Sequence, residues 1–97
     1  MNPLARLEKW YSAQCDGEWE HAFGISIDTL DNPGWTLKID LSGTEAENRA
    51  IDRVKIERSE NDWILYWVED KQFHADMGPQ NLTEGVEAFL SWLEISN

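Results

Sequence analysis

Apolar residues recur at helical spacing at both ends of the chain. The first series follows Asn2 and Pro3, which suit the cap and first turn of a helix, and consists of Leu4, Leu7, Trp10 and Tyr11. The second series follows Asn81 and Glu84, which have capping-box spacing, and consists of Leu82, Val86, Phe89, Leu90 and Leu93. The sequence therefore predicts two terminal helices, the first ending at Asp16-Gly17, and each with a single apolar stripe.

Between the helices, the pattern changes to the alternation that is typical of strands. Strands are predicted over 23–28, 35–41, 53–57, 63–68 and 73–77, with a polar loop over 42–50. Because most links between strands are short, we expect an antiparallel meander, and the single stripes place both helices on one face of the sheet. The predicted fold is an α+β domain spanning residues 1–97, with a five-stranded, mostly antiparallel meander sheet and N- and C-terminal helices packed on one face.

Two local features of this pattern carry their own predictions. The segment 63–68 is apolar on both faces, and we place Trp63 and Trp67 on the core side and Tyr66 on the open side, where the 42–50 loop is an alternative cover. The segment Asp31-Asn32-Pro33-Gly34 has the residues of a tight turn, and we expect Gly34 to adopt a positive φ there.

The charge of the chain limits its partners. Nineteen acidic and eight basic residues give a net charge of -11 in 97 residues, while a hydrophobic fraction of 41% is that of a globular protein. Nucleic acids and anionic membranes are disfavoured, because binding them depends on basic side chains. A basic protein, a metal ion or simple solubility remain as explanations of the acidity.

The acid is expected to gather at one end of the sheet. Alternate connections of a meander share an end, and this one collects 16–20, 42–52 and 69–71. The candidate binding residues for a cationic surface are Asp16, Glu18, Trp19, Glu20, Glu45, Glu47, Asp52, Glu69 and Asp70. Trp19 lies between two glutamates and is either an exposed anchor or a buried lid. The open sheet face gives a second candidate site, formed by Asp40, Tyr66 and His74. The alternative explanation of the acidic end is that charged residues simply occupy loops, without a binding function.

Catalytic and metal-binding patterns are sparse. Cys15 and His21 lack a residue that would orient the base, and one cysteine with two histidines does not complete a zinc site without carboxylates. A small enzyme or metal-binding protein that uses His21, His74 and nearby carboxylates is the alternative hypothesis, and it requires these groups to converge. The single cysteine and the absence of a membrane-length apolar run or an apolar signal segment near residue 1 predict a cytoplasmic protein.

The sequence as a whole resembles the immunity protein 53 family, the antidotes found beside toxins in bacterial polymorphic toxin systems. The most specific match is Leu30-Asp31-Asn32-Pro33-Gly34-Trp35. Further matching positions are Leu7 to Tyr11, Asp16 to His21, Gly24-Ile25, Thr29, Ile39-Asp40-Leu41, Thr44, Trp63, Phe73, Gly78, Leu82, Phe89 and Trp92.

The resemblance implies a non-enzymatic bacterial protein that binds and neutralises a cognate toxin domain without a cofactor or metal. The charge adds that this toxin domain is basic, and that the acidic residues named above are its contact surface. A monomer is the favoured state of the free protein. A toxin-like gene immediately upstream would separate this function from that of a general interaction module.

Overall fold

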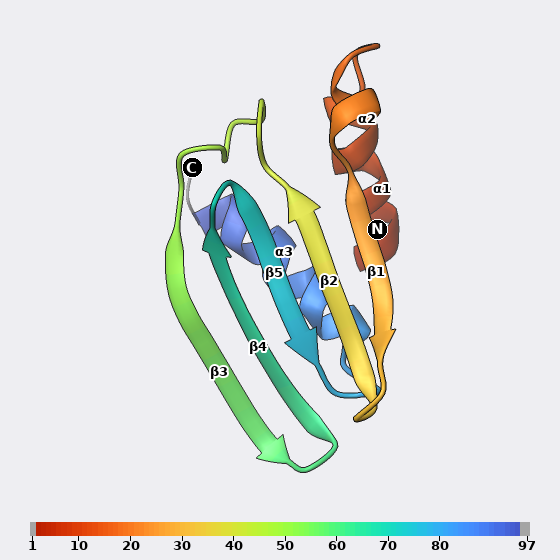
Figure 1. Cartoon of the computed structure of the whole chain (residues 1–97), viewed down its shortest axis with the longest axis vertical. Helices are drawn as coiled ribbons and strands as arrows, with labels where there is room; N and C mark the ends of the chain where they lie inside the picture. The colour runs from red at the N-terminus through yellow and green to blue at the C-terminus, as the bar shows by residue number, and fades with distance from the viewer. Residues whose placement is uncertain (1, 96–97) are drawn as a thin grey trace.

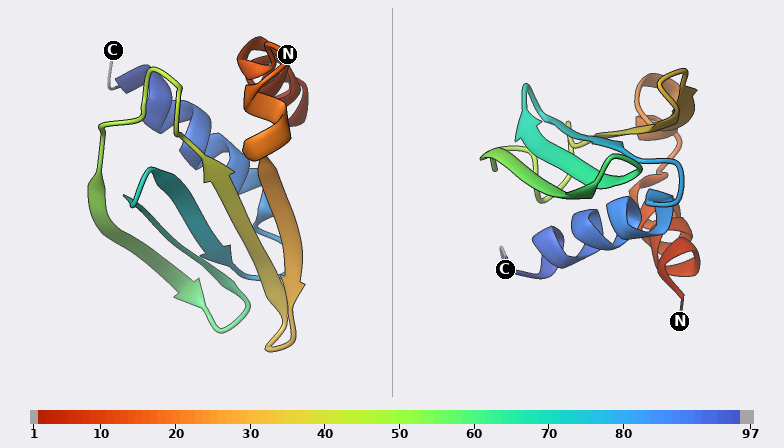
Figure 2. Two further views of the ribbon diagram at one scale, coloured as in Figure 1. Left: turned by 45° about the horizontal axis from the view of Figure 1, so that its top comes forward. Right: turned by 90° about the horizontal axis from the view of Figure 1, so that it is seen from below.

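The computed structural model describes residues 2–95. Across this range the chain forms a five-stranded antiparallel sheet in the order β1-β2-β5-β4-β3 (Figure 1). The elements in chain order are α1 (Pro3–Gln14), α2 (Trp19–Ala22), β1 (Ile25–Leu30), β2 (Gly34–Asp40), β3 (Ile51–Ser59), β4 (Asp62–Glu69), β5 (Gln72–Met77) and α3 (Leu82–Ile95). The fold class predicted from the sequence is confirmed, with α1 and α3 on the same side of the sheet (Figure 2).

The strand order differs from that of a sequential meander, because β3 lies at the far edge and β5 pairs with β2. The 41–50 segment crosses the ends of β5 and β4 to reach that edge (Figure 1). Burial explains the exchange: Phe73, Ala75 and Met77 of β5 are fully buried, whereas β3 carries Arg53 and Lys55. An apolar strand gains most from a central position, and a charged strand is tolerated at an edge.

The hydrophobic core lies between the sheet and α3. Leu37 and Ile39 of β2 meet the inward side chains of β5, and Phe89 of α3 packs edge-to-face on Phe73 with ring centroids 5.2 Å apart. Helix α1 adds Leu7 to this core and contacts mainly α3, with Trp10 packed edge-to-face on Phe89 at 5.0 Å. The single apolar stripes of the two helices are therefore buried against one another and against one sheet face.

The side chains of β4 face the opposite sides of the sheet from those predicted. Ile64, Tyr66 and Val68 face α3, and Tyr66 stacks on Phe73, whereas Trp67 lies on the open face. The alternation of β4 could not decide this, because large apolar residues occupy both of its sides. The pairing with β5 decides it, since Tyr66 lies opposite buried Ala75 and Trp67 lies opposite His74.

The ends of the elements follow local signals, with two exceptions. Asn2 accepts the backbone N–H of Ala5 at 2.8 Å and caps α1 as predicted. Asn81 precedes α3, but its side chain ties the helix to β4, accepting from the N–H of Trp63 at 3.3 Å and donating to Asp62 at 2.9 Å. Gly34 is not in the positive-φ region, unlike Gly17 and Gly43. No helix within residues 2–95 is long and apolar enough to cross a membrane.

Candidate functional site

The structure brings the predicted acidic segments to the same end of the sheet. Helix α2, the 41–50 segment and the turn between β4 and β5 all lie at the top of the molecule in Figure 1. The exchange of strand order leaves this unchanged, because β3 still begins where β2 ends.

The strand order nevertheless divides the acid into two groups. Asp16, Glu18 and Glu20 precede β1 at one edge of the sheet, while Asp52 lies on β3 at the other. Four strand spacings of about 4.8 Å separate these edges by about 19 Å. A single partner would therefore have to span the whole width of the sheet to touch both groups.

Several of these carboxylates have structural partners. Asp16 accepts the backbone N–H groups of Glu18 and Trp19, both at 2.9 Å, and these bonds hold its pKa below the usual range. Glu20 reaches back to the backbone N–H groups of Asp16 and Gly17. Together these hydrogen bonds fold the 16–20 segment into the start of α2, an element that the sequence pattern did not predict.

Two further carboxylates have partners beside the turn between β4 and β5. Glu47 pairs with Lys71 at 3.1 Å, which lowers the pKa of Glu47, and Glu69 accepts the indole N–H of Trp67 at 2.9 Å. The remaining acids of the predicted site are exposed and have no hydrogen-bond or ion-pair partner among residues 2–95; these are Glu18, Glu45, Asp52 and Asp70. We call these four residues the free acidic set.

Trp19 is buried, with 7% of its surface exposed. Its ring lies among Trp10, Tyr11 and Phe23 at centroid distances of 6.0 to 6.2 Å. Of the two roles considered for Trp19, the structure supports the buried lid and contradicts the exposed anchor.

The second candidate site, predicted on the open sheet face, does not bring its three residues together. Asp40 and His74 lie on the open face, but Tyr66 points to the opposite side of the sheet. Asp40 is engaged by two neighbours, accepting from the backbone N–H of Gly24 and from the Gln72 side chain, both at 2.9 Å. Asp40 therefore stabilises the β1–β2–β5 part of the sheet.

A stack of three side chains occupies the open face instead. The Trp67 ring of β4 lies parallel to the His74 ring of β5, with centroids 4.9 Å apart. The guanidinium of Arg53, on β3, lies 4.1 Å from the centroid of the Trp67 ring. Burial lowers the pKa of His74, and the nearby Lys38 and Arg53 charges oppose its protonation further, while Glu69 and Asp76 act in the other direction. The hydrophobic pattern contains no signal for this stack, because the stack depends on the register of three strands.

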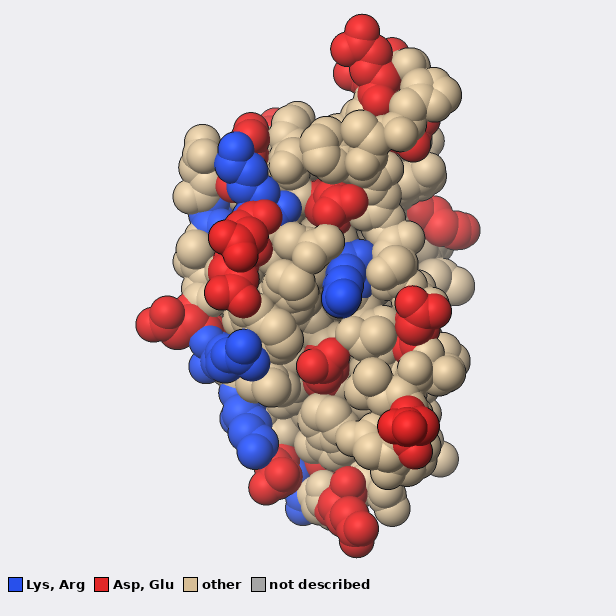
Figure 3. Space-filling view, in the orientation of Figure 1, with Lys and Arg blue, Asp and Glu red and all other residues tan. Residues whose placement is uncertain are grey.

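The charge is uneven across the open face. Basic side chains gather towards the β3 edge, and acidic ones dominate the β1 edge and the projecting α2 region (Figure 3). Between residues 8 and 47 the chain has nine acidic residues and two basic ones, whereas residues 49 to 71 have six and five. Most of this acid lies in the connecting segments rather than in the helices and strands; these acids are Asp16, Glu18, Asp31, Glu45 and Glu47.

The groups considered for catalysis are divided among several elements within residues 2–95. His21 lies on α2 and His74 on β5, and no cluster of three or more His, Cys, Asp or Glu residues suitable for a metal occurs in this range. The Cys15 thiol donates to the Tyr11 carbonyl oxygen at 3.3 Å, within its own helix end. His21 lines an open pocket together with Glu20 and Asp40, and His74 is not among the residues that line it.

The fold and surface define a small α+β protein with an unevenly distributed acidic surface and an open sheet face. The family model described as immunity protein 53 matches residues 4–94, and the chain belongs to that family. The resemblance inferred from the sequence is thus confirmed, and the family indicates an immunity protein whose partner is a toxin protein. Neither curated proteins nor solved structures gave a significant match.

Proposed function

We propose that this immunity protein neutralises a cognate toxin domain by non-covalent binding, and that the toxin surface it binds is basic. The observation that carries the proposal is the net charge of -11, with exposed acidic residues from three segments at one end of the sheet, in a member of an immunity family. Opposite charge on two partners accelerates their encounter and fixes their orientation. In this proposal the protein acts as a cytoplasmic monomer.

The free acidic set is the part of the predicted contact surface best suited to this role. Glu18, Glu45, Asp52 and Asp70 are exposed and have no partner among the described residues, so a bound cation would not have to displace one. Asp16, Glu20 and Glu47 are already engaged in holding α2 and the 41–50 segment. Exposed charges act mainly on the association rate, and salt screens them over roughly 8 Å at physiological ionic strength.

The test is charge reversal with a matched control. The triple variant Glu18→Lys, Glu45→Lys, Asp52→Lys changes the charge by the same amount as Glu8→Lys, Asp28→Lys, Glu60→Lys, and all six residues are exposed. Association and dissociation rates would be measured with an inactivated form of the toxin domain encoded beside this gene, at several salt concentrations.

We expect the first triple variant to associate about tenfold more slowly at low salt, with a weaker salt dependence than the control triple. Equal slowing by both triples would show that only net charge matters, and would contradict a recognition role for the free acidic set. Absence of binding and of inhibition by the unmodified protein would contradict the proposed function itself.

A further inference from the structure

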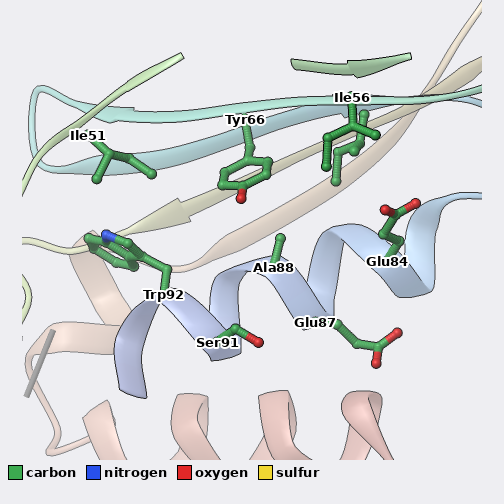
Figure 4. Close-up of a pocket in the computed structure, with 9 residues that line it drawn as sticks. Ile51, Ile56, Tyr66, Glu84, Glu87, Ala88, Ser91 and Trp92 are labelled. Atoms are coloured by element: carbon green, nitrogen blue, oxygen red, sulfur yellow. The ribbon is translucent and has the colours of Figure 1, made fainter. Parts of the chain in front are cut away.

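An open cleft lies between α3 and the sheet, on the side of β3 and β4 (Figure 4). Helix α3 packs over β5 and β4, and the inward side chains of β3 are left partly uncovered. Ile51, Tyr66 and Ile56 point from the sheet towards Ala88 and Trp92 of the helix (Figure 4). The cleft has a volume of about 400 Å³, which falls within the range of about 300–1,000 Å³ that is typical of ligand pockets.

The cleft has an apolar floor, and Glu87 lies at its rim on the helix side, with its carboxylate directed away from the sheet (Figure 4). Ile56 is 38% exposed although it is a large aliphatic residue, whereas Ile64, its partner on β4, is buried. On the helix side, Glu87 is exposed and has no partner among residues 2–95, whereas Glu84 is paired with Arg58 and closes one end. Helix α3 has three acidic residues and no basic residue over its described length.

A hydroxyl group adds a polar point within the apolar floor. The Tyr66 hydroxyl points towards α3 (Figure 4), and no residue within 2–95 forms a hydrogen bond with it. A ligand with an apolar body and a cationic, hydrogen-donating end satisfies all three features of the cleft. Lysine and arginine side chains have this form, because their aliphatic stems pack on apolar surfaces while the charged end stays polar.

We infer that this cleft receives a lysine or arginine side chain of the toxin, with its stem between Ile56, Tyr66 and Ala88 and its charge against Glu87. This inference rests on the proposed function and names the part of the partner that enters the cleft. A second copy of this chain is a poor occupant, because two molecules of net charge -11 repel one another. The β3 edge itself is also unsuited to strand addition, since it carries Arg53 and Lys55 and two register shifts.

Two pairs of matched variants test the inference. Glu87→Arg reverses the charge at the rim of the cleft, and Glu8→Arg makes the same change at an exposed position of α1. Ser91→Trp places a large ring at the mouth of the cleft, and Ser12→Trp places it on the exposed side of α1. The thermal midpoint of each variant shows that it is folded, and affinity is measured with the same inactivated toxin domain.

We expect Glu87→Arg and Ser91→Trp each to weaken binding about tenfold or more, mainly through faster dissociation, with both controls close to the unmodified protein. Tyr66→Phe, which removes only the hydroxyl, should have a smaller effect in the same direction. Unchanged affinity in both cleft variants, with binding by the unmodified protein intact, overturns the inference and leaves the proposed function standing. Weakening by Ser91→Trp without weakening by Glu87→Arg overturns the cationic occupant in favour of an apolar one.

Discussion

The indole N–H of Trp19 donates a hydrogen bond of 2.7 Å to the carbonyl oxygen of Ser42. This contact joins α2 to the first residues of the segment that carries the chain from β2 to the far edge of the sheet. Gly43, which follows at a φ of +77°, lies against the same indole, where an added Cβ would sit 3.4 Å from the ring. Trp19 is thus a structural bridge between two polar segments that the sequence presents as independent loops.

Replacement of Trp19 should therefore act on stability. Trp19→Ala removes a buried ring and a hydrogen bond, and we expect the free energy of unfolding to fall by about 3 kcal/mol. Trp19→Phe retains most of the ring contacts and loses the N–H donor, so its cost should be smaller. Urea unfolding checks both values, and full stability combined with rapid release of the toxin in Trp19→Ala would contradict a structural role.

Gly34 is expected to be intolerant of any side chain. A Cβ at this position would overlap the carbonyl oxygen of Met77 on β5, where β2 and β5 approach each other closely. Gly34→Ala should lower the free energy of unfolding by about 1–3 kcal/mol, as overpacking does. Gly24 is the matched control, because a Cβ there meets no atom within 4 Å and its φ is not in the left-handed region. Gly24→Ala should leave stability unchanged or slightly raised, and equal losses in both variants would refute the close-approach argument.

Asn81 provides a test of the link between α3 and β4. Asn81 is 6% exposed, and its side chain forms hydrogen bonds with Trp63, Asp62 and Glu84. Asn81→Ala leaves a partly buried N–H of Trp63 without this partner, and we expect a loss of about 2 kcal/mol in thermal or urea unfolding. Asn48→Ala, at an exposed position of the 41–50 segment, serves as the control and should be nearly neutral.

The His74 ring offers a prediction about pH. Burial, followed by the Lys38 and Arg53 charges, holds its pKa below the ordinary value of 6.5. The unfolded chain therefore binds this proton at a higher pH than the folded chain does. The free energy of unfolding should fall as the pH decreases from about 6.5 towards the lowered pKa, and this contribution should be fully present above 6.5.

A proton NMR titration of the His74 ring checks the shift directly. We expect a midpoint below 6.5, and Lys38→Gln should raise it because a nearby positive charge is removed. Lys55→Gln, on the open face of β3, should change it less. A midpoint at or above 6.5 would show that the Trp67 stack does not desolvate the ring.

Elements with a local signal were predictable from the sequence. Asn2 and Pro3 set the start of α1, and the alternation of Phe73, Ala75 and Met77 identified β5 as a strand with one buried face. Alternation failed for β4, because Trp67 and Tyr66 are equally apolar and only the pairing with β5 assigns them to sides. The short helix α2 was missed because Asp16 and Glu20 stabilise it through side-chain hydrogen bonds to the backbone, which a hydrophobic pattern does not record.

The sequence by itself determined the fold class, the acidic character, the family resemblance and the end of the sheet at which the acidic segments meet. These depend on composition, on local periodicity and on the alternation of antiparallel strands, none of which requires the strand order. Only the tertiary structure decided that Trp19 is buried, that Tyr66 enters the cleft beside α3 and that Trp67 stacks on His74. The sides of Tyr66 and Trp67 follow from the register of β4 with β5, and Trp19 is covered by neighbouring aromatic rings and tied to Ser42, so neither depends on a pattern that the hydrophobic alternation records.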